Sequence, residues 1–237
     1  GRLQIGVDVA FAQMGDDAAI APRRGKKIAE VRAFKGGDPD ALAEEVYAIA
    51  MDYREPREQP PLVVYDALGS TGHDFGRSLR RYEKELEIRA VFGNKAPRDP
   101  RRFWRRRDEV AHEFVSWVKR GGALPPDAML EGECLRLVAR PHGKDAPQSE
   151  IPSNDEIRAI LGRSPDRRNA CELAVLDVDG EETAEPPPPP ALASAAQASL
   201  DTPAAPRAPR RAPEPEAAPP SVFSQQDELY GALWGSQ

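Results

Sequence analysis

The chain has 237 residues, of which 40% are hydrophobic and 30% charged, and its formal net charge at pH 7 is −6. This length fits one domain of ordinary size with a tail, or two small domains. The negative balance argues against a protein that meets nucleic acid with its whole surface, although it leaves room for a local basic patch. No run of about 18 apolar residues occurs, so no membrane-spanning helix is expected.

The pattern of apolar residues before residue 180 predicts a mixed α/β domain. The predicted strands cover residues 3–10, 17–21, 27–34, 62–65 and 88–92, and the predicted helices cover residues 42–53, 71–84 and 110–118. A last helix is expected to begin at Ser164-Pro165-Asp166, with Ser164 as N-cap and Pro165 in the first helical position. Three strands in hairpin order, followed by alternating helices and strands, predict a mixed sheet flanked by helices. That is the ribonuclease H-like arrangement.

The composition changes near residue 180, and we expect a domain boundary there. Twelve of the 25 prolines lie beyond it, separated mainly by Ala, Ser and Arg. Such a segment buries too little apolar surface to offset its ordering entropy, so residues 181–237 are predicted to be a disordered linker. Its end contains apolar residues in polar surroundings, which we interpret as a short docking motif: Val222, Phe223, Leu229, Tyr230, Leu233 and Trp234.

The cysteines and the first residues of the chain give weaker indications about its origin. Cys134 and Cys171 lie far apart and outside any Cys-x-x-Cys spacing, which favours a reduced intracellular protein over a zinc site. The chain opens with Gly1, without Met or a signal peptide, directly into the first predicted strand. We interpret it as a piece of a longer protein.

Three carboxylates occur where a sheet of this kind would bring them together. Asp8 lies near the end of the first predicted strand, Asp66 ends the fourth, and Asp166 lies in the first turn of the last helix. Carboxylates crowded in one cleft need a compensating cation, and two Mg²⁺ or Mn²⁺ ions fit because hard cations prefer oxygen ligands. Such a pair supports phosphodiester hydrolysis. Each Asp taken alone has a simpler interpretation, as a turn residue or a helix cap.

These residues stand in segments that resemble the nuclease domain of phage large terminase subunits. The resemblance covers residues 3–178. The matching segments are Gly6-Val7-Asp8-Val9-Ala10, Gly15-Asp16-Asp17, Val63-Val64-Tyr65-Asp66-Ala67-Leu68-Gly69-Ser70-Thr71-Gly72, Val91-Phe92-Gly93, Arg107-Asp108-Glu109, Leu124-Pro125-Pro126-Asp127 and Gly162-Arg163-Ser164-Pro165-Asp166. It implies a two-metal endonuclease that cuts concatemeric double-stranded DNA, with Asp8, Asp66 and Asp166 as catalytic and metal-binding residues.

The same resemblance implies further domains and partners, and this sequence departs from the family pattern at two points. Family members carry an ATPase motor domain ahead of the nuclease and work in the host cytoplasm, with the portal protein or the small subunit as natural partners. Nothing here resembles the Gly-rich phosphate loop of that motor. Many members have a second Asp three residues after Ser-Pro-Asp, where this chain has Asn169. If that later position is the true ligand the site is weakened, although Asn can coordinate through its carbonyl oxygen.

A run of arginines between residues 98 and 107 is the candidate DNA contact. It holds six arginines with Phe103 and Trp104 among them, a combination that suits a nucleic-acid backbone. The alternative is a solvated loop with both aromatic rings packed on the core. The proposed DNA-binding residues are Arg101, Arg102, Arg105 and Arg106.

Two rival functions remain open from the sequence. One is a module of the same fold that binds or docks on DNA with weak or no cleavage, which Asn169 and the long tail keep open. The other is an actin-like or sugar-kinase-like ATPase, since such proteins also open with a Gly-Val-Asp-Val strand. Those need Gly and Ser/Thr phosphate loops in two duplicated halves, and Phe11-Ala12-Gln13-Met14 supplies none.

Overall fold

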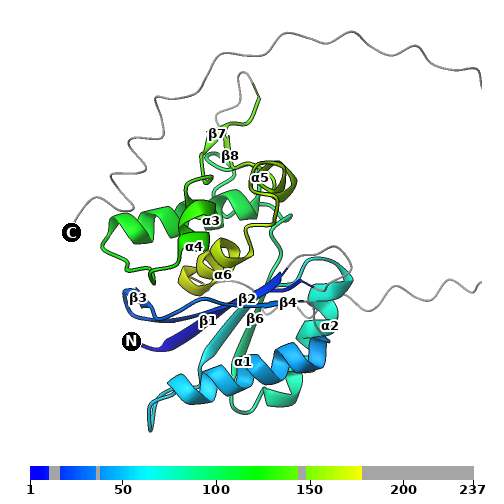
Figure 1. Cartoon of the computed structure of the whole chain (residues 1–237), viewed down its shortest axis with the longest axis vertical. Coiled ribbons are helices and arrows are strands. Elements are labelled where there is room, and N and C mark those ends of the chain that lie inside the picture. Colours follow the sequence, from blue (N-terminus) through cyan, green and yellow to red (C-terminus); the bar gives the residue numbers. More distant parts are fainter. Residues whose placement is uncertain (11–16, 36–37, 144–147, 178–237) are drawn as a thin grey trace, which may run out of the picture.

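A mixed β-sheet lies between two layers of helices in the computed structural model, which describes residues 1–10, 17–35, 38–143 and 148–177 (Figure 1). The six strands of this sheet are β1 (Leu3–Asp8), β2 (Asp17–Arg24), β3 (Lys27–Ile28), β4 (Arg32–Lys35), β5 (Leu62–Asp66) and β6 (Glu87–Val91). The helices are α1 (Pro39–Tyr53), α2 (Gly69–Leu79), the 3₁₀ turn η1 (Arg80–Tyr82), α3 (Arg106–Lys119), α4 (Ala128–Cys134), α5 (Asn154–Leu161) and α6 (Asp166–Val175). A separate two-stranded ribbon joins β7 (Arg140–Pro141) to β8 (Ser149–Glu150).

The strand order explains the mixed character of the sheet. The order is β3-β2-β1-β5-β6, and β4 also pairs with β2. β1 and β2 are antiparallel, whereas β1, β5 and β6 run parallel. α1 and α2 cover one face, and α3, α4 and α6 cover the other (Figure 1). The predicted ribonuclease H-like fold class is confirmed.

The prediction of one continuous strand over residues 27–34 is wrong. This segment is divided into β3 and β4, which both pair with β2. Ile28 pairs with Arg23 and Arg32 pairs with Ile20, so three residues on one side face two on the other, as in a β-bulge. The break lies opposite Pro22, which has no N–H to donate to the ladder.

Two helix boundaries also differ from the prediction. α2 begins at Gly69 and gives way to the 3₁₀ turn after Leu79, so the predicted helix over residues 71–84 is shifted and shortened. Pro165, and not Ser164, occupies the N-cap of α6, and no side chain caps that helix. Asp166 lies in the first turn, as predicted. None of the described helices combines the length and hydropathy needed to cross a bilayer.

Side-chain alternation along β1 assigns each face of the strand a different partner. Leu3, Ile5 and Val7 are fully buried in the cluster that includes α1. Gln4 and Gly6 face α6: the Gln4 amide donates to the carbonyls of Leu173 and Leu176 at 3.1 and 2.8 Å. Asp8, two residues further along, therefore points to the same side as Gln4 and Gly6.

Gly6 lets α6 lie directly on the strand. A Cβ at this position would lie 2.0 Å from the Ala170 carbonyl oxygen and 2.3 Å from the Ala174 amide nitrogen, and both are backbone atoms that cannot rotate away. We predict that Gly6→Ala destabilises the protein by at least about 2–3 kcal/mol, because α6 must shift off β1. Chemical denaturation measures this change. An unchanged unfolding free energy would show that α6 does not pack this closely.

The segments predicted to form a linker and docking motif, residues 181–237, lie outside the described residues, as do positions 178–180 of the predicted domain.

Candidate active site

Asp8 and Asp66 end two neighbouring parallel strands in the same register. Gln4 pairs with Leu62 and Val7 with Tyr65, so the next pair in this register is Asp8 with Asp66. Adjacent strands lie about 4.8 Å apart, and even-numbered residues of both strands point to the α6 side. On β5 the same alternation buries Val64 beside Leu173 of α6. The strands that end in Asp8 and Asp66 are therefore neighbours, as the expected convergence of these two carboxylates requires.

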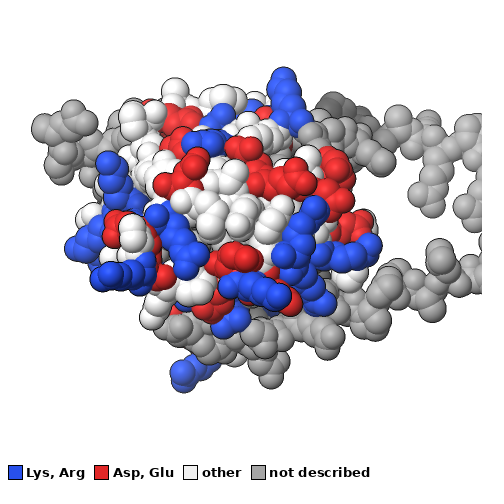
Figure 2. All heavy atoms as spheres, turned by 90° about the horizontal axis from the view of Figure 1, so that it is seen from below, with Lys and Arg blue, Asp and Glu red and all other residues white. Residues whose placement is uncertain are grey.

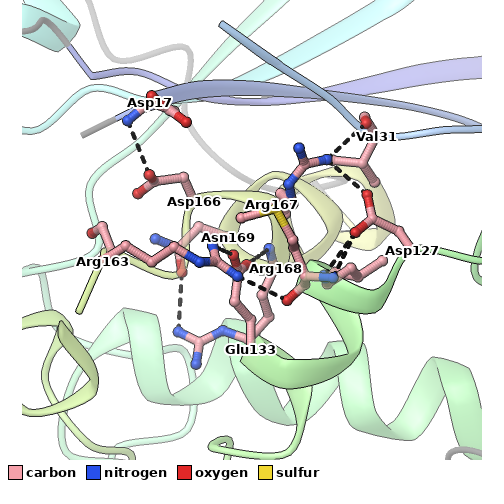
Figure 3. Close-up of polar contacts among 12 residues, drawn as sticks. Asp17, Val31, Asp127, Glu133, Arg163, Asp166, Arg167, Arg168 and Asn169 are labelled. Carbon is pink, nitrogen blue, oxygen red and sulfur yellow. Dashed lines mark hydrogen bonds and ion pairs between the residues drawn. The ribbon is translucent and has the colours of Figure 1, made fainter. Parts of the chain in front are cut away.

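The first turns of α6 bring two further polar groups to this end of the sheet. Asn169 donates from its side-chain nitrogen to the Asp8 carboxylate at 3.1 Å. Asp166, one turn earlier, accepts from the backbone N–H of Asp17 at 3.1 Å, and Figure 3 shows its side chain directed toward that strand. Asp166 therefore lies against the start of β2, and Asn169 lies against Asp8.

Partly buried ion pairs fix the position of α6. Glu133 of α4 is fully buried, accepts from the Arg168 backbone N–H at 2.7 Å, and forms an ion pair with Arg163 (Figure 3). Arg167 donates to Asp127 at 2.7 Å and to the Val31 carbonyl at 3.1 Å. These contacts hold the helix in register with the strand ends, because a buried charge is tolerated only with a partner in place.

A pocket of about 180 Å³ opens between these elements. Asp8, Asp66, Asn169 and Glu172 form its polar wall on the strand and α6 side. The other lining residues are Leu68, Val91, Gly93, Asn94, Arg105, Arg107, Val110, Ile151, Asn154, Arg168 and Leu173. Asp166 does not line this pocket. The structure thus brings two of the three predicted acids into one cavity and places the third beside it.

Several ionisable carboxylates are crowded together on one wall of the pocket. Burial raises the pKa of Asp8 well above its ordinary value of 3.8, and the nearby charges of Asp166 and Asp66 raise it further, while the hydrogen bond from Asn169 lowers it. Burial also raises the pKa of Asp66, against the hydrogen bond from the Leu68 backbone and the positive charge of Arg107. The pKa of Glu172 is raised by burial. These carboxylates repel one another when ionised.

This donor set fits a hard divalent cation. Buried carboxylates with raised pKa values are stabilised in their ionised form by a bound cation, and carboxylate and amide oxygens are ligands that Mg²⁺ and Mn²⁺ accept. Among the described residues no three His, Cys, Asp or Glu side chains are grouped closely enough to hold a metal ion by themselves. Asp8 and Asp66 would be the protein ligands, with the Asn169 amide beside Asp8 and Glu172 behind them.

The predicted DNA-binding arginines divide into two groups. Arg101 has a side chain that is 94% exposed, Arg102 is exposed beside Phe103, and Arg105 is exposed at the pocket. Arg106 is different: its side chain is 6% exposed and pairs with Glu109 at 2.7 Å and Glu113 at 3.3 Å. A guanidinium buried between two carboxylates cannot reach a DNA backbone, so the assignment of Arg106 to the DNA contact is wrong.

The two aromatic residues of this run also differ in burial. Phe103 is buried, as the alternative interpretation expected. Trp104 is 42% exposed and stacks on His142 with ring centroids 3.9 Å apart.

Three pocket residues were not assigned to the site from the sequence. Two of them, Arg168 and Glu172, lie on α6 on either side of Asn169. The third, Arg107, was noted only as a member of the basic run. The spacing of Asn169 and Glu172, three residues apart, places them on one helix face and was the available signal. Arg168 could not be found this way, since a fully buried arginine has no sequence signature.

Solved structures of known nucleases share this fold. No protein-family model matches the chain, and no curated protein matches it. The nuclease domain of the large terminase subunit gp2 of bacterial virus Sf6 is 13% identical, with a TM-score of 0.59 over 75% of this chain and 89% of that chain. The same coverage and score hold for its K428A mutant with manganese and beta-thujaplicinol.

A second phage protein gives a similar result. The large terminase nuclease from thermophilic phage G20c with bound magnesium is 15% identical, with a TM-score of 0.54 over 73% of this chain and 80% of that chain. The predicted resemblance is confirmed at the level of the fold. The chain has the ribonuclease H-like fold of phage large terminase nuclease domains.

Proposed function

We propose that this chain is a metal-dependent endonuclease domain that hydrolyses phosphodiester bonds of double-stranded DNA. The observation that carries the proposal is the register of Asp8 and Asp66 on one sheet face, with Asn169 bonded to Asp8 at 3.1 Å. This places two carboxylates and a side-chain amide at the end of parallel strands, in a pocket of about 180 Å³. The fold likeness to terminase nucleases solved with manganese and magnesium supports the same chemistry.

The residues of the pocket have distinct roles in this proposal. Asp8 and Asp66 bind a pair of Mg²⁺ or Mn²⁺ ions, and when bound such ions supply an activated water and neutralise the leaving oxygen. Asn169 orients the Asp8 carboxylate through its N–H. Asp166 adds negative charge next to Asp8 from the first turn of α6. Apolar residues such as Val91, Val110 and Ile151 limit water at the site.

We further propose that the domain is the nuclease of a viral packaging terminase that cuts concatemeric DNA in the host cytoplasm. The motor ATPase would then belong to the parent chain, and the portal protein or the small subunit would be its partners. The fold likeness supports this assignment. Exposed Arg101 and Arg102 would contact the DNA outside the pocket, and Arg105 would contact it at the pocket mouth.

A plasmid assay tests the proposal. The parent should nick and linearise supercoiled plasmid with Mn²⁺ or Mg²⁺, and EDTA should stop the reaction. Asp66→Asn should slow cleavage by at least about 100-fold, because the site loses a charged ligand. Asp74→Asn, a partly exposed aspartate of α2 outside the pocket, is the matched control and should cut like the parent. Equal rates for the Asp66 variant and the parent would refute the site.

The alternative of a DNA-binding module with weak cleavage rests on one observation. Asn169 gives the pocket a neutral side chain where a third carboxylate would strengthen metal binding. This candidate predicts DNA binding by the parent without metal-dependent cutting. The same plasmid assay, combined with a binding measurement, separates the two functions.

A further inference from the structure

Three arginines line the pocket along with its carboxylates. Arg105 and Arg107 come from the start of α3, and Arg168 comes from α6. Their burial increases in the order Arg105 (exposed), Arg107 (half-buried) and Arg168 (fully buried). The pocket therefore carries positive charge from its mouth to its depth, and we call these three residues the arginine wall.

Arg107 is held in place by neutral groups. Its guanidinium donates to the Pro152 carbonyl at 2.9 Å and to the Asn154 side-chain oxygen at 3.4 Å, and its backbone N–H donates to the Gly93 carbonyl at 3.0 Å. Within the described part of the chain no carboxylate lies at ion-pair distance from it. Burial lowers the pKa of Arg107, so the folded protein bears a cost for placing this charge here. Such a cost is expected where a charge serves an anionic ligand.

Arg168 supplies an unsatisfied buried donor at the same pocket. Its side chain is fully buried, donates through Nη2 to the Asn169 oxygen at 3.0 Å, and lies 2.9 Å from the Glu172 carboxylate through Nε. Its Nη1 atom is buried and has no hydrogen-bond partner among the described residues. A buried donor of this kind is destabilising unless a ligand or water completes it.

We propose that the arginine wall is a phosphate-binding subsite. Arg105 and Arg107 hold the non-bridging oxygens of one DNA phosphate opposite Asp8 and Asp66, and the buried Arg168 adds positive charge behind them. The planar guanidinium fork matches phosphate geometry, and two such forks fix the phosphate without reading the sequence. Asn94 and Asn154 add neutral donors around it. This inference rests on the proposed nuclease function and names the part of the substrate that the pocket recognises.

Substitution of Arg107 tests the subsite through DNA binding in the absence of divalent metal. Arg107→Gln keeps much of the stem and removes the charge. Binding to a fluorescent duplex of about 20 base pairs should weaken by roughly 10-fold, and the slope of log K against log salt should fall in magnitude by about 1. A variant that melts like the parent but binds with the parent's affinity and salt slope would overturn the subsite.

Two further variants make the result specific. Arg2→Gln is the control. Arg2 is also half-buried and donates to a proline carbonyl, that of Pro60, but it pairs with Glu87 and lies at the opposite end of β1 from Asp8. This variant should bind like the parent. Arg107→Lys keeps the charge but loses the fork; it should retain the salt slope and cleave at saturating DNA about 10-fold more slowly. If Arg107→Gln does not fold, a Lys variant that cleaves at the parent's rate overturns the subsite.

Failure of the subsite and failure of the nuclease give different results. If the parent cuts DNA in an Asp66-dependent manner but Arg107 variants bind and cut normally, the nuclease stands and the arginine wall does not. If the parent does not cut but Arg107→Gln weakens binding as expected, the arginine wall stands and the nuclease does not.

Discussion

Asp8→Asn is expected to abolish metal-dependent cleavage, with a loss of at least about 10³-fold in rate. Asp8 is the acid most involved in the pocket: it lines the cavity, accepts from Asn169, and is influenced by the charges of Asp66 and Asp166. Asparagine keeps its shape and an acceptor oxygen for Asn169 but removes the charge that binds a cation. Single-turnover cleavage of plasmid measures the loss, and a rate within a few-fold of the parent's would contradict it.

The same substitution should stabilise the metal-free protein. The folded state raises the pKa of Asp8 above its ordinary value of 3.8. The associated stability is therefore present below pH 3.8 and is lost as the pH rises through the folded-state pKa. At neutral pH the ionised Asp8 is destabilising, among Asp66, Asp166 and Glu172. Asp8→Asn should raise the melting temperature in EDTA, and added Mn²⁺ should raise that of the parent alone.

An unchanged or lower melting temperature for Asp8→Asn in EDTA would contradict this electrostatic account of the pocket. It would leave the cleavage prediction standing. The melting temperature therefore reports on the repulsion between the carboxylates, and the cleavage rate reports on their role in catalysis.

Asn169→Asp is expected to strengthen metal binding and to increase cleavage activity. The new carboxylate replaces a neutral amide beside Asp8, and divalent-metal affinity depends strongly on the number of charged ligands. We expect Mn²⁺ to bind at least about 10-fold more tightly and cleavage at low metal concentration to rise accordingly. In EDTA the variant should be less stable than the parent, because one more carboxylate is crowded into the pocket.

Asn94→Asp is the matched control for this gain. Asn94 also lines the pocket but lies on the exposed loop after β6. Calorimetric titration with Mn²⁺ should show parent-like affinity for Asn94→Asp and tighter binding for Asn169→Asp. Equal affinities for all three proteins would show that Asn169 does not face the cation.

The sheet and the position of two acids were predictable because they depend on period-two alternation and strand order. Apolar runs that end in Asp8 and Asp66 indicate strands, and parallel neighbours bring their ends together. Gly6 could not be assigned its role from the sequence, because the contact of α6 with β1 is a tertiary feature. The bulge opposite Pro22 was also missed, although a proline without an N–H was a local sign of it.

The contributions of α6 and α3 to the site depend on helix rotation and on ion pairs distant in sequence. Asp166 and Asn169 lie on one face of α6, about one turn apart, so the position of the helix along its own axis decides which of them faces the pocket. The Glu133 contacts that fix this position come from another helix. In the same way Arg106 and Arg107 are adjacent in sequence, yet one is buried against Glu109 and the other lines the pocket. Residue type alone could not separate them.

Diffraction from crystals soaked in Mn²⁺, recorded near the manganese absorption edge, would locate the bound metal ions. We expect anomalous peaks between the carboxylates of Asp8 and Asp66 on the side facing Asn169, and their loss in Asp8→Asn. Peaks confined to other parts of the surface, with none at this end of the sheet, would contradict this expectation.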